Sequence, residues 1–120
     1  GVREPAAKPL VDAVRERLEA YRRRVDAWSG LGAEDLELDA RPAADLLYHL
    51  LAAGLLLGEG QALCDRSRDF RKFAAAALYA RRWLDPPPPG APRFASADLQ
   101  WLDSLADWTP VPEQALTGRR

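Results

Sequence analysis

Residues 8–28 read KPLVDAVRERLEAYRRRVDAW and carry the clearest periodic pattern in the chain. Apolar side chains recur there every three or four residues, which places them along one side of a helix. They are Val11, Val14, Leu18, Tyr21, Val25 and Trp28. Charged residues fill most of the other positions, and Gly30 and Gly32 follow the last apolar residue. The spacing therefore predicts an amphipathic helix over 8–28 that ends at these glycines.

The next helical stretch is apolar on nearly every side. We expect it to span about 42–64, with Pro42 near its first turn and the acidic segment 34–45 as the connection that leads into it. A helix that is apolar all round belongs in the middle of a bundle. Gly54 and Gly58 lie one turn apart on it, so we expect these two positions to pack closely against a neighbouring helix.

A third helix is expected to end at the four consecutive prolines 86–89. The polar residues 65–67 form a break before it, and Ser67 is a candidate for its N-terminal cap. Its apolar residues again follow three-four spacing and are Phe70, Phe73, Ala77, Ala80 and Leu84.

A short fourth helix is expected after Pro92, with Ser96 as its cap, and an irregular tail over 109–120. The apolar face of this helix consists of Leu99, Leu102, Leu105 and Ala106. No run of β-branched residues alternates with polar ones, so nothing favours a sheet. The predicted fold class is all-α: a bundle of three longer helices, a short fourth helix and an irregular C-terminal tail.

Length and composition point to a single domain over 1–120. The chain has 120 residues, a formal net charge of -1, 48% hydrophobic residues and 29% charged residues. This composition excludes a disordered chain and a membrane-embedded one, and the size suffices for a core without disulfides or metal. The apolar run 46–58 is too short to span a bilayer and no secretory signal opens the chain, so we expect a cytoplasmic protein.

Two biases of composition concern the origin of the chain. It contains no methionine, which predicts a segment of a longer polypeptide. Arginine outnumbers lysine by 15 to 2, and isoleucine and asparagine are missing, which is typical of a GC-rich bacterial genome.

The chain has few side chains that could bind a metal ion, transfer a proton or act as a nucleophile. One cysteine and one histidine are too few for a structural zinc site, and the acids of 34–45 lack the spacing of a calcium loop, so we expect no metal. His49 is either a proton-transfer group or a packed ring, and its apolar surroundings favour packing. Cys64 is either a nucleophile activated by Arg66 or Arg68, or an inert thiol, and the lack of a histidine beside it favours the second.

Basic residues gather in the third helical region. Residues 65–84 have a net charge of +4, from six basic and two acidic side chains. Nucleic acid or a phosphorylated ligand is one candidate partner. The overall charge and the absence of a known module favour instead a solvated helix face, or ion pairs with the acidic segment, and no nucleic acid. The glycines at 58 and 60 follow no strand, which excludes a dinucleotide-binding turn.

Residues 72–84, KFAAAALYARRWL, are followed one residue later by the prolines. They resemble the last helix of the accessory domain at the C-terminus of many larger bacterial acyl-CoA dehydrogenases. Residues 45–63, which begin with Asp45-Leu46-Leu47, look like the preceding helix of that domain. The stretch from the first residue of one segment to the last of the other, 45–84, covers 40 residues of the chain.

The resemblance implies a segment of a flavoenzyme of fatty acid metabolism that removes two hydrogens from an acyl-CoA thioester. In such enzymes FAD and the catalytic glutamate belong to preceding domains, so no residue here inherits a catalytic or cofactor-binding role. The partner would be the rest of the polypeptide or another subunit.

The alternative is a self-contained helical interaction or dimerisation module, and thus a homo-oligomer. Trp101 and Trp108 are seven residues apart, and on one continuous helix they would form an outward-facing aromatic strip for such a partner.

Overall fold

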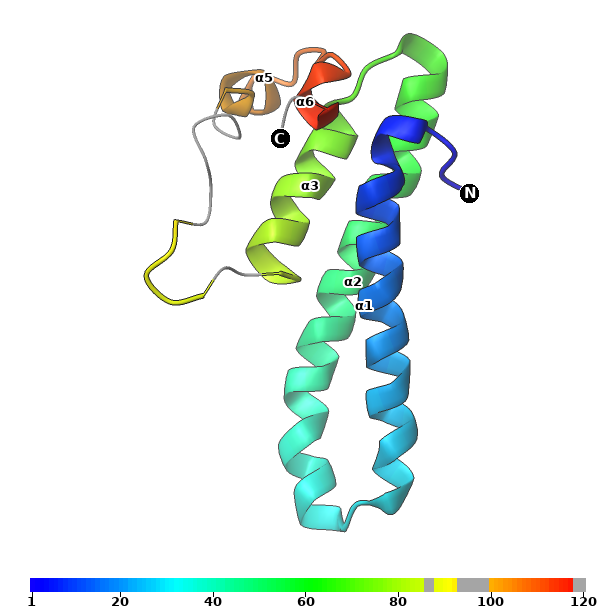
Figure 1. Ribbon diagram of the computed structural model, residues 1–120, viewed down its shortest axis with the longest axis vertical. Helices are drawn as coiled ribbons and strands as arrows, with labels where there is room; N and C mark the ends of the chain where they lie inside the picture. The colour runs from blue at the N-terminus through cyan, green and yellow to red at the C-terminus, as the bar shows by residue number, and fades with distance from the viewer. Residues whose placement is uncertain (86–87, 93–99, 118–120) are drawn as a thin grey trace.

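The computed structural model describes residues 1–85, 88–92 and 100–117 (Figure 1). Helices α1 (Lys8–Asp26) and α2 (Ala33–Ser67) form a long antiparallel hairpin, and α3 (Arg71–Trp83) lies beside the C-terminal half of α2. The shorter elements are η1 (Pro5–Ala7), η2 (Ala27–Gly30), α5 (Leu102–Ala106) and α6 (Gln114–Thr117). The described residues include no strand, so the all-α prediction is confirmed.

Helix α1 matches its prediction. Its apolar residues Val14, Leu18 and Tyr21 pack against Leu50 and Ala53 of α2. The 3-10 helix η2 continues the chain to Gly30, and Gly32 is the extended N-cap residue of α2. The three-four spacing therefore located both the helix and its buried side.

The expected connection over 34–45 is wrong, because these residues form the first part of α2 and Pro42 lies inside the helix. Glu34 and Asp35 occupy the first turn, where negative charge interacts favourably with the helix dipole. Farther along, Ala43 is buried and Asp39 forms an ion pair with α1. These interactions outweigh the hydrogen bond that a proline removes from a helix interior.

The break between α2 and α3 falls later than expected. Ser67 is the last residue of α2 and its Oγ donates to the carbonyl of Leu63, so it does not cap α3. The chain turns at Arg68, which has a left-handed φ of 51°. Asp69 Oδ1 accepts a hydrogen bond from the backbone N–H of Arg71, the first residue of α3, at 3.0 Å. Asp69, and not Ser67, therefore satisfies a backbone donor at the start of this helix.

The C-terminal segment is more ordered than the predicted irregular tail. Val111 and Ala115 are buried against Ala74 of α3, and α6 lies at the end of this contact. The backbone N–H of Phe70 donates to the carbonyl of Val111 at 2.8 Å. The expected cap Ser96, together with Leu99, Pro86, Pro87 and residues 118–120, lies outside the described residues.

The expected close packing at Gly54 and Gly58 is wrong. Both are exposed, and a Cβ atom added at either would meet no described atom within 4 Å. The close contact is at Gly60, where an added Cβ would lie 2.7 Å from Cδ1 of Phe73. Helix α2 does pack against both α1 and α3, as a central helix should, but the side that carries Gly54 and Gly58 is uncovered.

This difference predicts opposite effects for the same substitution one half-turn apart. Gly58→Ala should raise the free energy of unfolding by about 0.5–1 kcal/mol, because alanine is the better helix former and meets no atom. Gly60→Ala should lower it by about 1–2 kcal/mol, because the steric cost against Phe73 exceeds that gain. Urea denaturation of both variants measures the two values, and equal shifts would contradict the assignment of the faces.

Candidate functional site

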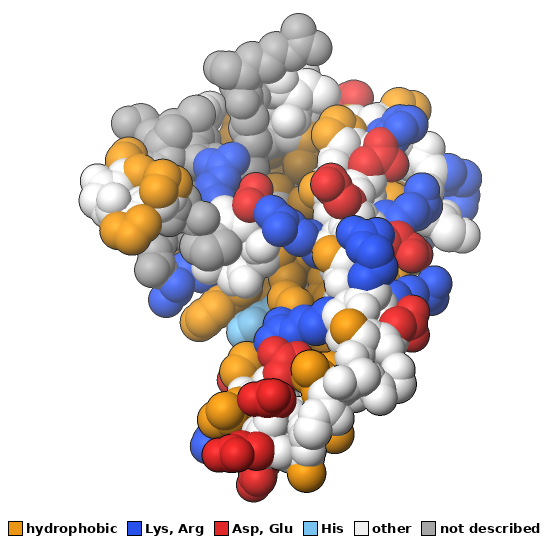
Figure 2. Space-filling model, turned by 60° about the horizontal axis from the view of Figure 1, so that its bottom comes forward, with side chains coloured by type: hydrophobic (Ala, Val, Ile, Leu, Met, Phe, Trp, Pro, Cys, Tyr) orange, Lys and Arg blue, Asp and Glu red, His pale blue; other side chains and the backbone are white. Residues whose placement is uncertain are grey.

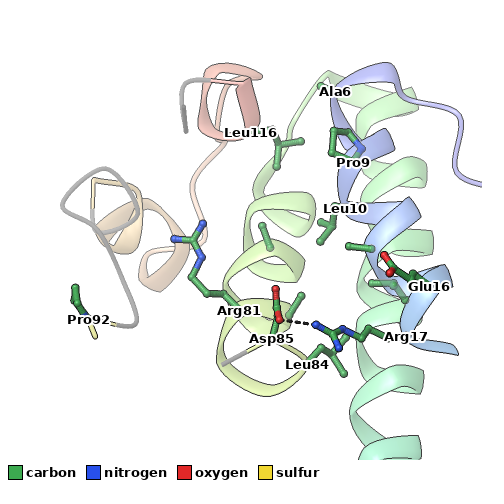
Figure 3. A pocket seen from close by; sticks show the side chains of 14 residues that line it. Ala6, Pro9, Leu10, Glu16, Arg17, Arg81, Leu84, Asp85, Pro92 and Leu116 are labelled. Atoms are coloured by element: carbon green, nitrogen blue, oxygen red, sulfur yellow. Dashed lines mark hydrogen bonds and ion pairs between the residues drawn. The ribbon is translucent and has the colours of Figure 1, made fainter. Parts of the chain in front are cut away.

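A groove of about 660 Å³ lies between α1 and α3, which both pack against α2 (Figure 3). Leu10 and Leu84 point into it, and small residues such as Ala77 leave the space open. At one end Arg17 Nη2 lies 2.5 Å from Asp85 Oδ1. The described lining residues include no histidine, cysteine or serine. The groove can hold an apolar group, but its described lining supplies no nucleophile beside a base.

His49 occupies the packed arrangement that the sequence favoured. Its Nδ1 lies 2.6 Å from the hydroxyl of Tyr79, and its ring stacks on Trp83 with centroids 4.5 Å apart and planes 8° from parallel. Tyr48 approaches edge-on at 5.4 Å. Burial raises the pKa of Tyr79. The imidazole thus joins α2 to α3 through ring contacts and one hydrogen bond.

Cys64 is buried beside Glu4 and Arg68. Its Sγ lies 3.5 Å from Glu4 Oε2, and Arg68 Nη1 lies 2.8 Å from the same oxygen. Burial and the contact with Glu4 raise the pKa of the thiol, although Arg68 opposes them. A nucleophilic cysteine needs a lowered pKa, so the environment agrees with the inert thiol. The carboxyl of Glu4 is destabilised by burial, yet hydrogen bonds from Arg68 and Cys64 hold its pKa below the usual value.

The ion pairs expected between the basic residues of the third helical region and the acidic segment 34–45 are not found among the described residues. Three of these basic residues contact acids elsewhere in the chain, and Arg82 lies over the ring of Trp83 at 4.2 Å. The ion pairs are Arg68–Glu4 (2.8 Å), Arg71–Asp69 (3.0 Å) and Lys72–Glu59 (2.7 Å). These pairs neutralise much of the charge that a polyanion would contact.

The aromatic strip expected from Trp101 and Trp108 does not form, because α5 ends at Ala106 and Trp108 has a left-handed φ of 59°. Trp101 packs against the buried cluster of Ala74, Val111 and Ala115. Trp108 is half exposed, and the cations of Arg71 and Lys72 lie 4.6 Å and 4.7 Å from its ring centroid. The two indoles therefore belong to different environments.

A row of exposed apolar side chains lies on α2, on the side opposite its buried residues Ala53, Leu57 and Cys64. Tyr48, Leu51 and Leu55 are 68%, 60% and 69% exposed. Smaller residues continue the same three-four spacing, and we call the whole row the outer face of α2. It consists of Ala44, Tyr48, Leu51, Leu55, Gly58 and Ala62, all of them exposed.

This exposed face was not predicted, although the apolar residues that form it are visible in the sequence. A helix that is apolar on every side needs neighbours on every side, and the predicted bundle offered too few helices to cover it. By length and composition α2 is long enough to cross a membrane, which the shorter predicted run was not. The central helix of a soluble bundle has the same property, so the observation does not identify a membrane span.

A partly buried ion pair joins the two arms of the hairpin near its turn. Arg24 Nε and Trp28 Nε1 donate to Asp39 Oδ2 at 2.9 Å and 2.6 Å. These hydrogen bonds, that of Arg24 first, lower the pKa of Asp39 to about 2 from 3.8.

The lowered pKa predicts a pH dependence of folding. A carboxyl with a lowered pKa in the folded state stabilises the protein above its unfolded pKa and loses this contribution as the pH falls through the folded value. We expect the stability advantage of the wild type over Asp39→Asn to be constant above about pH 4 and to shrink toward pH 2. Urea midpoints measured at several pH values test this, and a difference that does not vary with pH would contradict it.

In the part of the chain that the structure describes, no group of three or more His, Cys, Asp or Glu side chains is arranged to hold a metal ion. The described geometry thus offers an apolar groove, an exposed apolar helix face and several intramolecular ion pairs. No protein-family model, no curated protein and no solved structure matches this chain.

Proposed function

We propose that this chain is a non-catalytic helical interaction module that packs the outer face of α2 against another protein surface. The observation that supports the proposal is the exposure of Tyr48, Leu51 and Leu55 in one row. Single exposed leucines are common on soluble proteins, whereas a contiguous apolar row marks a surface that a partner covers. Its three-four spacing suits packing against a helix.

The polar clusters of the described residues support a structural rather than a chemical role. Cys64 is buried with a raised pKa, and His49 is engaged by Tyr79 and Trp83. General acid–base catalysis needs a titrating group within reach of a substrate proton, and a nucleophile needs an adjacent base. Neither His49 nor Cys64 is placed for either of these roles.

A photocrosslinking experiment tests the proposal and identifies the partner at the same time. A photoreactive phenylalanine analogue is placed at Leu51 in the intact cellular protein, and crosslinked peptides are identified by mass spectrometry. Leu38 provides the matched control, because it is 72% exposed on the same helix but outside the outer face. We expect one defined crosslinked surface from position 51 and none from position 38. The absence of any product specific to position 51 would contradict the proposal.

A second candidate is the accessory domain of an FAD-dependent acyl-CoA dehydrogenase. The two segments that carry this resemblance, 45–63 and 72–84, lie on α2 and α3, which pack together. In this case the covering surface would be the dehydrogenase body or another subunit, and FAD would bind in the preceding domains.

Flavin titration tests the second candidate. The purified chain should bind no FAD and oxidise no acyl-CoA, and the crosslinked peptide from position 51 should derive from a flavoprotein domain. Stoichiometric quenching of flavin fluorescence by this chain alone would contradict both candidates, because both place the chain outside the catalytic machinery.

A further inference from the structure

We propose that the partner of the outer face of α2 is the same face of a second copy of this chain, packed antiparallel about a two-fold axis. This inference rests on the proposed function and names its partner. The axis would pass α2 at the level of Ala53, midway along the face. An isologous contact of this kind requires one surface to be complementary to itself.

The sizes of the side chains are self-complementary in the antiparallel orientation. With the axis at Ala53, Leu51 faces Leu55 of the second copy, and Tyr48 faces Gly58. The outermost pair is Ala44 with Ala62. The largest residue of the face therefore meets the residue without a side chain, and the remaining pairs match in size. Interdigitation of large and small residues is what close helix packing requires.

The parallel orientation lacks this complementarity. Each residue would face its own copy, so two Tyr48 rings would meet at one level and two Gly58 residues at another. The first contact would hold the helices apart, and the second would leave a gap that neither copy fills. Size alone thus favours the antiparallel arrangement.

Charge favours the same orientation. Residues 34–45, at the N-terminal end of α2, carry five acids and one arginine, whereas Arg66 near the C-terminal end is a cation without an ion pair among the described residues. Figure 2 shows acidic side chains gathered at the tip of the hairpin, and basic and acidic side chains interspersed over the rest of this view. Antiparallel packing places the acidic end of each copy beside Arg66 of the other copy, which lowers the electrostatic energy and favours this orientation.

One exposed pair makes the charge argument specific. Glu37 and Arg66 lie on the same side of α2 as the outer face, beyond its two ends, and both are exposed. Neither has an ion-pair partner within the described residues. In the antiparallel dimer they come within about one helical turn of each other across the interface, at both ends.

The size of the face predicts the strength of association. It spans about 27 Å, or five helical turns, and one helix of this length buries less than the roughly 800 Å² per partner of a standard interface. We therefore expect a weak dimer, in concentration-dependent equilibrium with the monomer.

Sedimentation velocity over a wide concentration range tests the dimer. Leu51→Glu/Leu55→Glu should raise the dissociation constant by about tenfold or more, because it places four charges in the interface. Leu31→Glu/Leu38→Glu is the matched control, since these leucines are exposed outside the face, and it should associate like the wild type. Glu37→Arg should weaken the dimer, and adding Arg66→Glu should restore it.

Disulfide formation tests the orientation. Ala44→Cys/Ala62→Cys should form a covalent dimer under mild oxidation, whereas Ala44→Cys alone should not. The wild type, whose only thiol is the buried Cys64, is the background. Dimers from Ala44→Cys alone would indicate the parallel arrangement and overturn the inference.

The remaining outcomes separate this inference from the proposed function. A wild type that is monomeric at every concentration overturns the dimer, while a crosslink from position 51 to another protein still supports the interaction module. Binding to phosphatidylcholine vesicles that Leu51→Glu/Leu55→Glu abolishes, with no dimer in solution, overturns the dimer in favour of a lipid surface. Equal self-association of the wild type and the Leu51→Glu/Leu55→Glu variant also overturns the dimer through this face, because a different surface would then be the interface, while the crosslink from position 51 decides the proposed function separately.

Discussion

Asp69→Ala should lower the free energy of unfolding by about 3–5 kcal/mol, among the largest effects of any single substitution in this chain. The carboxylate is only 3% exposed, and its Oδ1 accepts hydrogen bonds from the backbone N–H groups of Arg71 and Val111, each at 3.0 Å. Its Oδ2 lies 3.0 Å from Arg71 Nε in an ion pair, although that nitrogen has no hydrogen bond. Removing the carboxylate leaves two backbone donors without their acceptor and takes the counter-charge from the largely buried guanidinium of Arg71.

The position of Asp69 explains why the loss should spread beyond one turn. The residue lies between α2 and α3 and also holds Val111, whose burial attaches the C-terminal segment to α3. We therefore expect Asp69→Ala to release that segment, with a change in the fluorescence of Trp101. Asp69→Asn keeps an acceptor oxygen and should cost less.

Urea unfolding measures both variants against Asp26→Ala, which replaces an exposed aspartate and should change stability by less than about 0.5 kcal/mol. If Asp69→Ala unfolds at the same urea concentration as Asp26→Ala, the carboxylate is not the connection that the structure indicates.

Local sequence patterns predicted those features of the fold that are set by the residues within a single helix. The spacing from Val11 to Trp28 located α1 because the apolar residues of an amphipathic helix recur with the helical period on the side that packs against the rest of the protein. The start of α2 was missed because Pro42 and the neighbouring acids carry strong local signals for a connection. The helix there depends on a contact with the other arm, between Asp39 and Arg24, which local patterns do not contain.

The candidate surface was mispredicted for a related reason. Gly54 and Gly58 have the spacing of a close helix contact, but only tertiary structure shows that Gly60 faces Phe73. Trp101 and Trp108 share one side only if the helix continues between them, and the left-handed backbone at Trp108 ends that continuity. The apolar character of α2 is visible in its own residues, whereas the number of helices available to cover it depends on the whole chain.

Phe73→Ala should lower the free energy of unfolding by about 3–5 kcal/mol, because the fully buried ring leaves a cavity that the helices cannot close. The ring packs among Leu57, Cys64 and Phe70 in the cluster that joins α2 to α3. Phe73→Leu retains most of the volume and should cost less.

The same ring sets the sign of the effect at Gly60, and a double-mutant cycle isolates this dependence. On its own, Gly60→Ala places a methyl group against Phe73, so it should destabilise the protein. In the Phe73→Ala background the obstruction is gone, and Gly60→Ala should raise the free energy of unfolding by about 0.5–1 kcal/mol through helix propensity. Contacting residues are expected to be non-additive in this way, whereas Gly58→Ala, which meets no described atom, should have the same effect in both backgrounds. The free energy of unfolding is measured in urea for the wild type, Gly60→Ala, Gly58→Ala, Phe73→Ala and the two double variants that combine Phe73→Ala with each glycine substitution. Strict additivity of Gly60→Ala and Phe73→Ala would mean that the missing side chain at Gly60 does not serve the contact between α2 and α3.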